Sequence, residues 1–360
     1  MSVLSTPVQL GSLTLPNRVI MAPLTRCRSE TERIPTPLMV EYYTQRAGAG
    51  LIVTEATSVS PQGVGYRGTP GIWSTEQVAG WKRVTEAVHA AGGRICLQLW
   101  HVGRISDPEH LGGELPVAPS AIQPAGHVRR LRPKRDYRTP RALETAEIPG
   151  IVEDFRKGAQ NAKEAGFDGV TLHGANGYLI DQFLQDSTNQ RTDRYGGSLE
   201  NRARFLMEIV DAVATVWEPQ RIGVHLRPRM EEHDMGDSHP RELFPYLAGA
   251  LREKDVGFLF IREIEGADSL LPYMKQRFAG SVIANEQMTA ADGERLIHAG
   301  VADAVAFGRD YIANPDLAER IALGAELNLP VTSTFYPSLD ASCERDLAVG
   351  YTDYPAMRRS

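Results

Sequence analysis

The chain has 360 residues, of which 42% are hydrophobic and 23% are charged, a composition typical of soluble globular proteins. Its formal net charge of −6 argues against a protein that coats nucleic acid, because such proteins are strongly basic. No apolar run approaches the roughly 20 residues that cross a bilayer, and the first residues lack the basic and apolar regions of a secretory signal. Three scattered cysteines are too few for a disulfide framework. We therefore expect a cytoplasmic protein with reduced thiols and no membrane or nucleic-acid partner.

Buried strands alternate with helical patterns along the chain. Eight short runs rich in valine, isoleucine and leucine have the near-continuous apolar character of strands that are covered on both faces. They lie at residues 18–23, 51–56, 95–100, 169–174, 222–227, 258–262, 281–285 and 304–308. Eight strands alternating with helices predict an α/β fold, a closed parallel (β/α)₈ or TIM barrel. The alternative, a doubly wound open sheet, would normally carry a glycine-rich turn after its first strand, and residues 22–25 read Ala-Pro-Leu-Thr instead.

Helix boundaries support this alternation. Ser74 followed by Gln77 and Thr289 followed by Asp292 are typical of capping boxes at helix starts. Four helical stretches end in Ala-Gly before a strand, and glycine there takes the left-handed conformation without steric cost. The four pairs are residues 47–48, 91–92, 165–166 and 299–300.

Two regions fall outside the repeating unit. Residues 1–17, with Gly11-Ser12 between short apolar runs, predict a β-hairpin that plugs the bottom of the barrel. Residues 102–148 form a long excursion, rich in proline, glycine and arginine, after the third strand, where barrel insertions often become lids. No linker interrupts the chain, so we expect one domain over residues 1–360.

The active site of such a barrel lies at the carboxyl ends of its strands. None of the six lysines is found there, which argues against an aldolase that forms a Schiff base. Carboxylates are scarce, which weakens a metal-dependent hydrolase, although His101, His173 and His225 could still converge on a metal. The remaining neutral donors and acceptors suit a planar heterocycle, and Gly308-Arg309 after the last strand suits a phosphate. Both features together favour FMN.

Five motifs carry a family resemblance: NRVIMAPLTR (17–26), LQLWHVGR (97–104), the long segment 173–205, AVAFGRDYIANPDL (304–317) and GYTDYP (350–355). They resemble the Old Yellow Enzyme family of FMN-dependent ene-reductases, and most of all its bacterial reductases of xenobiotics, N-ethylmaleimide and pentaerythritol tetranitrate. The resemblance implies a barrel that binds FMN non-covalently and is reduced by NADPH or NADH. The reduced enzyme would then pass the hydride to an activated C=C bond of a small electrophile, in a ping-pong cycle.

The resemblance also assigns roles to single residues. His173 and Asn176 would donate hydrogen bonds to a substrate carbonyl or nitro oxygen, and Tyr178 would be the proton donor. Thr25 would contact both the flavin carbonyl and the substrate. Further walls of the substrate pocket would be Tyr66, Trp100 and Tyr351. Further cofactor contacts would be Pro23, Leu24, Ala56, Gln98, Asn285, Glu286, Gln287, Gly308 and Arg309.

One position departs from the family pattern. Many relatives place an arginine on the fifth strand, against the N1 edge of the flavin, and here that position holds His225, with Arg227 two residues on. Residues i and i+2 share a face of a strand, so either side chain could carry positive charge to the cofactor. Glu286 in the phosphate loop must point away from the phosphate.

Several questions stay open at this stage. The basic run 127–141 is either a solvated loop or a device that steers the 2′-phosphate of NADPH through Arg129, Arg130 and Arg132. The same barrel could instead reduce nitrate esters or nitroaromatics. A metal-dependent hydrolase and a barrel without catalytic activity are more remote alternatives. Neither the physiological substrate nor the choice between monomer and homodimer follows from the sequence.

Overall fold

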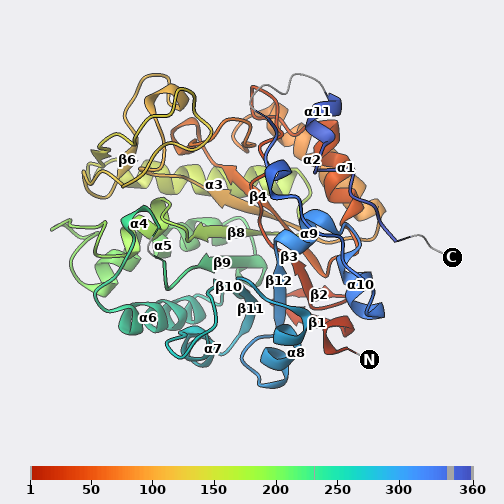
Figure 1. The fold of residues 1–360 in the computed structure, drawn as a ribbon. Coiled ribbons are helices and arrows are strands. Elements are labelled where there is room, and N and C mark those ends of the chain that lie inside the picture. Colours follow the sequence, from red (N-terminus) through yellow and green to blue (C-terminus); the bar gives the residue numbers. More distant parts are fainter. Residues whose placement is uncertain (1, 231, 339–343, 358–360) are drawn as a thin grey trace.

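The protein is described by a computed structural model that covers residues 2–230, 232–338 and 344–357. Eight parallel strands close into a barrel in the order β10-β11-β12-β3-β4-β5-β8-β9, with helices around them (Figure 1). The strands are β3 (Val19–Met21), β4 (Leu51–Ser58), β5 (Ile95–Trp100), β8 (Gly169–Gly174), β9 (Ile222–Leu226), β10 (Phe258–Arg262), β11 (Ser281–Asn285) and β12 (Ala304–Phe307). Each coincides with a predicted strand, so the predicted closed barrel is confirmed.

Helices follow most barrel strands and cover the outside of the barrel. They are α1 (Pro37–Gln45), α2 (Thr75–Ala90), α3 (Ile148–Glu164), α4 (Leu179–Leu184), α5 (Leu199–Ala214), α6 (Pro240–Glu253), α7 (Leu271–Phe278), α8 (Ala290–His298), α9 (Arg309–Ala313), α10 (Leu317–Leu323) and α11 (Glu344–Ala348). Both predicted capping boxes are present, at the starts of α2 and α8. No helix in the described part of the chain is both long and apolar enough to span a membrane.

Glycines end three of the four helices at which the Ala-Gly pattern predicted them. Gly92, Gly166 and Gly300 have φ values of 83°, 85° and 69°, in the left-handed region. The prediction is wrong after α1, where Gly48 does not take a positive φ. There Gly50 is required for a different reason, because a Cβ at this position would lie 2.2 Å from the carbonyl oxygen of Asn17.

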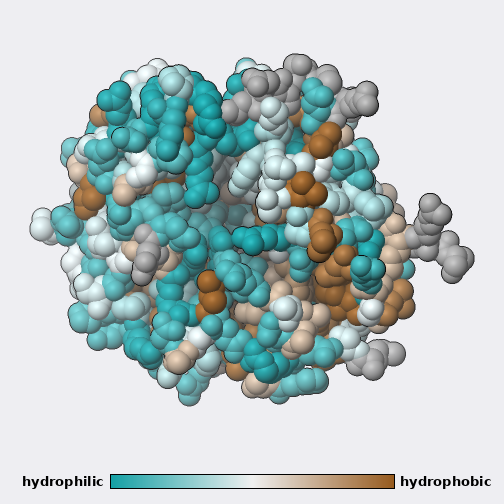
Figure 2. Space-filling model, in the orientation of Figure 1, coloured by the Kyte–Doolittle hydropathy of each residue, from teal (hydrophilic) through white to brown (hydrophobic). Residues whose placement is uncertain are grey.

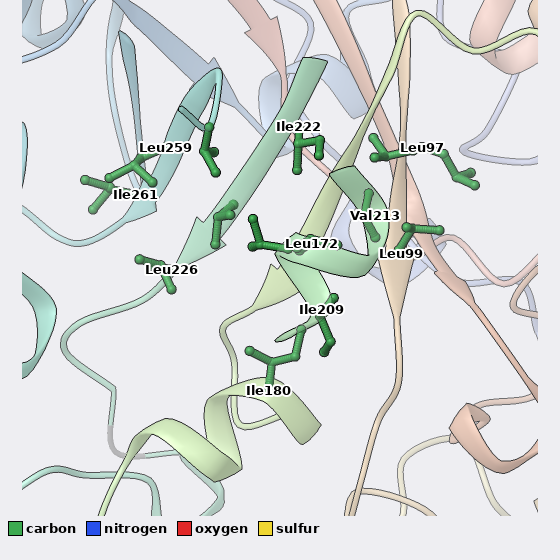
Figure 3. Packing of buried hydrophobic residues seen from close by; sticks show 14 of the residues in the cluster. Leu97, Leu99, Leu172, Ile180, Ile209, Val213, Ile222, Leu226, Leu259 and Ile261 are labelled. Carbon is green, nitrogen blue, oxygen red and sulfur yellow. The ribbon is translucent and has the colours of Figure 1, made fainter. Parts of the chain in front are cut away.

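The core has two layers, separated by the barrel wall. Outside the wall, strand side chains such as Leu97, Leu172 and Leu259 pack against helix side chains such as Ile180 and Ile209 (Figure 3). Inside it, a second cluster fills the amino-terminal half of the barrel, as expected for a fold whose interior is packed and not a pore. That cluster includes Ile20, Leu51, Val53, Cys96, Phe258, Phe260 and Ile283.

The amino-terminal hairpin closes one end of the barrel. Strands β1 (Val8–Leu10) and β2 (Leu13–Leu15) pair antiparallel, and their leucines belong to the interior cluster. Gly11 at the turn has φ 56°, and a Cβ there would lie 2.0 Å from the carbonyl oxygen of Gln220. Only glycine therefore allows this close docking, which leaves the carboxyl ends of the strands as the open end of the barrel.

The excursion after β5 packs over that open end. It contains the short strands β6 (Val117–Ala118) and β7 (Arg141–Ala142) and a bridge between His127 and Asp136. Its buried side chains Val128 and Leu131 join an aromatic cluster with Tyr66, Trp100 and Tyr137.

Hydrophilic residues dominate the face seen in Figure 2, which is hollowed near its centre, and apolar residues gather beside α10.

Candidate active site

A cavity of about 670 Å³ opens at the carboxyl ends of the barrel strands, within the size range of small-molecule and cofactor sites. It gathers predicted residues from seven of the eight strands or the loops that follow them, and β10 contributes only Arg262, which was not predicted. Those residues are Pro23, Leu24, Thr25, Ala56, Tyr66, Gln98, His173, Asn176, Tyr178, His225, Arg227, Asn285, Glu286, Gln287, Gly308 and Arg309. Side chains that are separated by almost 290 positions in the sequence thus face one space.

Two predicted pocket walls do not line this cavity. Trp100 is fully buried behind the wall, where its ring stacks on Tyr66 at 5.6 Å and meets the edge of Tyr178 at 5.0 Å. Tyr351 is also fully buried, and it stacks on Tyr42 at 4.0 Å with the guanidinium of Arg28 4.4 Å from its ring centre. Trp100 therefore supports the wall from behind, and Tyr351 is covered by neighbours that the sequence pattern does not reveal.

Two imidazoles and an amide lie side by side in the cavity. Nε2 of Gln98 lies 3.1 Å from Nδ1 of His225. Because that amide nitrogen can only donate, Nδ1 of His225 accepts and the ring proton is on Nε2. The His225 ring stacks on His173 at 5.1 Å, and both Nε2 of His225 and Nδ1 of His173 are buried without a hydrogen-bond partner among the described residues. Such orphaned polar atoms favour a bound polar ligand.

Burial keeps both imidazoles neutral. Burial, aided by the charge of Arg262, lowers the pKa of His173 to about 3. Burial also lowers the pKa of His225 well below its ordinary value, with smaller contributions from His173, Arg262 and Arg227. A neutral ring at this position offers a hydrogen bond and no charge, which favours Arg227 as the one of the two predicted side chains that brings positive charge to the cavity.

Asn176 is held by two arginines. Nη1 of Arg262 donates to its Oδ1 at 3.0 Å, and Nη1 of Arg227 lies 3.4 Å from the same oxygen. Arg262 also pairs through Nε with the carboxylate of Glu286, whereas Arg227 pairs with Glu232 at 3.3 Å. Glu286 thus faces Arg262, so its carboxylate is not free to repel a phosphate. Sequence reasoning missed Arg262, although its place as the last residue of a predicted strand was a usable signal.

Tyr178 sits at the start of α4 with its phenol in the cavity. Its hydroxyl lies 3.0 Å from that of Tyr66. Burial raises the pKa of Tyr178 to about 12, although Tyr66 and Arg129 act in the opposite direction. The phenol is therefore protonated at neutral pH. The preceding loop is firmly placed, because the amide of Gly177 donates to Asp181 at 2.9 Å.

The opposite end of the cavity is built from tight backbone turns. Glu286 and Gln287 have positive φ values of 104° and 53°, and a Cβ at Gly308 would lie 3.3 Å from Leu24. Arg309 lies beside this turn with an exposed side chain. Apolar Pro23, Leu24 and Ala56 offer a surface that fits the ring system of FMN, and the unpartnered imidazole nitrogens and Arg309 offer polar partners for its ring atoms and phosphate.

Further lining residues were not among the predicted site contacts. Phe335 and Tyr336 come from the segment after α10, beyond the last barrel strand. Arg129 reaches the cavity from the excursion. The others are Ala22, Arg26, Met230, Glu232, His233, Met288, Ala306, Phe307, Asp310 and Ile312.

His101 does not join His173 and His225. It is buried outside the cavity lining, and its Nδ1 accepts a hydrogen bond from the amide of Gly103 at 3.1 Å. Within residues 2–230, 232–338 and 344–357, no three histidine, cysteine or carboxylate side chains are grouped so that they could hold a metal ion. The hypothesis that these three histidines converge on a metal, as in a metal-dependent hydrolase, is therefore wrong.

Comparisons with known proteins identify the family of this chain. The model of the NADH:flavin oxidoreductase / NADH oxidase family matches residues 3–328. Morphinone reductase, solved in complex with tetrahydroNAD, is 51% identical with a TM-score of 0.93, and the match covers 99% of this chain and 98% of that chain. The Old Yellow Enzyme homologue from Zymomonas mobilis is 42% identical with a TM-score of 0.93, over 98% of this chain and 99% of that chain. The 12-oxophytodienoate reductase 1 of Oryza sativa subsp. japonica is 44% identical over 98% of this chain and 93% of its own.

The match covers most of the chain and includes the strand ends that line the cavity. Solved relatives with this barrel are above 40% identical, so the likeness extends beyond the fold. The chain therefore belongs to the Old Yellow Enzyme family and is an FMN-dependent oxidoreductase that draws its electrons from a nicotinamide cofactor.

Proposed function

We propose that the enzyme reduces activated C=C bonds in α,β-unsaturated carbonyl compounds, maleimides and nitroalkenes, with NADPH or NADH as the reductant. The observation that carries this proposal is the convergence of His173, Asn176 and Tyr178 on one cavity. Two of these side chains offer N–H donors, and the third offers a phenolic proton. This combination matches a reaction in which negative charge grows on an oxygen and a proton is then added to carbon.

His173 and Asn176 bind and polarise the substrate oxygen. FMN, when bound, supplies the hydride that adds to the β-carbon. As the hydride adds, charge moves onto the carbonyl or nitro oxygen, and donors fixed in advance stabilise that charge more than the neutral substrate. Because His173 is neutral above its lowered pKa of about 3, both residues act as neutral donors across the physiological range.

Tyr178 completes the reduction by giving a proton to the α-carbon. Its hydroxyl has Tyr66 as a hydrogen-bond neighbour at 3.0 Å, which holds the phenol in place. The raised pKa keeps the proton available at neutral pH. A donor at hydrogen-bond distance from the reacting carbon is the geometric requirement for general acid catalysis.

An anaerobic visible spectrum of the purified holoenzyme tests this function. NADPH should bleach the flavin bands, and N-ethylmaleimide should restore them with formation of N-ethylsuccinimide, identified by mass spectrometry. If only a nitrate ester restores the bands, with release of nitrite, the substrate class moves to the alternative reaction on the same barrel. If neither compound reoxidises the bleached protein, the proposal is contradicted.

The reductant preference depends on Arg129, which lies at the edge of the cavity. The neighbouring arginines are engaged elsewhere, because Arg130 donates to the carbonyl of Pro337 at 3.0 Å and Arg132 donates to that of Leu131 at 2.8 Å. Arg129→Ala should therefore raise the KM for NADPH about fivefold, the size of an exposed charge interaction, and leave that for NADH nearly unchanged. Arg132→Ala is the matched control, and equal effects of Arg129→Ala on the two reductants would contradict steering of the 2′-phosphate.

We further propose that residues 1–360 form a single domain in which residues 102–148 cover the site. We also propose that the protein acts in the cytoplasm, as a monomer or homodimer. The excursion supports the covering role because Arg129 lines the cavity and Val128 packs beside Tyr66. Exposed Leu323 at the end of α10 and Leu329 in the segment after it are apolar side chains that a homodimer would cover. Light scattering after size-exclusion chromatography decides between the two oligomeric states.

A further inference from the structure

We propose that Arg262 is a positioning residue that fixes the direction of the Asn176 amide. The inference rests on the proposed function, in which Asn176 donates a hydrogen bond to the substrate oxygen. An asparagine amide has a donor end and an acceptor end of nearly the same shape, so a half-turn of the group exchanges them. With the acceptor end toward the substrate, the same side chain would repel the oxygen that it has to stabilise.

Hydrogen-bond chemistry decides which end faces the arginines. A guanidinium has five N–H donors and no acceptor, so the atom it contacts must be the carbonyl oxygen. Arg262 makes this contact at 3.0 Å and Arg227 at 3.4 Å, both to Oδ1 of Asn176. The Nδ2 group is consequently turned away from both cations, and Asn176 lines the cavity.

The backbone contacts around Asn176 do not fix the direction of its side-chain amide. Asn176 has φ 61°, in the left-handed region, and Gly177 follows with φ 75°. Buried Asp181 and Gln182 hold this turn, through the amide and the carbonyl of Gly177 respectively, at 2.9 and 2.7 Å. These bonds place the Cα of Asn176 but do not touch its side chain. The arginines alone supply side-chain partners for its oxygen among the described residues.

Arg262 is the better placed of the two arginines. It ends β10, and the neighbouring strand β11 brings Glu286 beside it, so that the carboxylate binds Nε while Nη1 remains for Asn176. The side chain of Glu286 is only 14% exposed and that of Arg262 is 32% exposed, so the carboxylate that anchors Arg262 is largely sheltered. The partner of Arg227 is Glu232, whose side chain is 56% exposed. A charged donor on Oδ1 also polarises the amide, which strengthens its N–H donors.

A double-mutant cycle tests the inference on the holoenzyme. Asn176→Ala should lower kcat/KM for N-ethylmaleimide about 100-fold, as loss of one preorganised donor does. Arg262→Met should lower it about tenfold, within the usual range for coupled neighbours. In the double variant, Arg262→Met should cause no further loss, because the group through which it acts is gone. Arg262→Lys, which keeps a charged donor, should restore part of the activity.

Controls separate positioning from a general structural role. Arg295→Met removes a guanidinium that pairs with Glu265 and Asp292 and is 53% exposed outside the cavity, and it should change nothing. If an unpaired Glu286 prevents Arg262→Met from folding, the variant Arg262→Met/Glu286→Gln removes that charge and serves in its place. The melting temperature and the FMN content of each variant are measured alongside the kinetics.

Each outcome bears on the proposal. Losses that multiply in the double variant would mean that Arg262 acts independently of Asn176, which overturns the inference. Activity retained in Arg262→Met but lost in Asn176→Ala would overturn it as well, while leaving the proposed function intact. If Asn176→Ala itself keeps full activity, Asn176 is not the donor and the inference fails. The reduction of N-ethylmaleimide would then still support the proposed function, without the role assigned to Asn176.

Discussion

Replacing His173 and Asn176 together by alanine is expected to lower the rate constant of the oxidative half-reaction with N-ethylmaleimide by about three orders of magnitude, since one preorganised donor accounts for roughly 100- to 1,000-fold. The two donors act on one oxygen, so their single losses should not add in full. The His173 ring is held in a buried stack with His225, with the ring centres 5.1 Å apart.

Stopped-flow reoxidation of the pre-reduced enzyme measures this effect directly. His298→Ala, which changes an exposed histidine at the end of α8, is the matched control and should leave the rate constant unchanged. A loss below about tenfold in the double alanine variant would contradict the assigned roles, because it would fall short of even one oxyanion donor. The saturated product should still form slowly, since the flavin and Tyr178 remain in place.

The barrel was predictable because its strands are buried on both faces. That burial demands continuous apolar runs, which the sequence shows directly at residues 51–56 and 258–262. The Ala-Gly pattern predicted helix ends less reliably. Such a pair follows both α1 and α2, but only Gly92, after α2, adopts the left-handed conformation. At Gly50 the constraint comes from the carbonyl of Asn17, a contact across strands that no local pattern contains.

The candidate site was predictable where a side chain lies near the carboxyl end of a strand. Gln98, His173 and Asn285 are such cases, because parallel strands bring their carboxyl ends to one edge. Burial behind other side chains was not predictable, so Trp100 and Tyr351 were placed wrongly. The charge of a buried side chain could not be predicted from the sequence either.

The charge of a strand-end residue depends on its neighbours in space. His225 is neutral because it is buried, and the other contributing groups are Arg227, two residues on, and His173 and Arg262, which lie on other strands. Arg262 gains its role only because β11 places Glu286 beside it and the loop after β8 brings Asn176 within 3.0 Å. The polar contacts of the site thus depend on which strands are neighbours and on how they are aligned. The sequence of a single strand shows neither.

Tyr178→Phe is expected to slow reoxidation by N-ethylmaleimide about 100-fold or more, because it removes the general acid while keeping the ring. The ring contact with Trp100 at 5.0 Å should hold the phenylalanine in the same place. Reduction by NADPH needs no proton from this phenol and should stay within about twofold of wild type. Tyr66→Phe, which removes only the hydroxyl at 3.0 Å from Tyr178, is the control and should have a smaller effect.

The pH dependence gives the same proton donor a second test. Because burial raises the pKa of Tyr178 to about 12, the protonated phenol persists into strongly alkaline solution. The donor form is the protonated one, so its contribution is complete below the raised pKa and is lost as the pH rises through it. The wild-type rate constant should therefore be flat from about pH 6 to pH 10, where a free tyrosine would already be half ionised. A fall centred near about pH 10 would show that the phenol titrates as an exposed one and that its buried setting does not protect the proton.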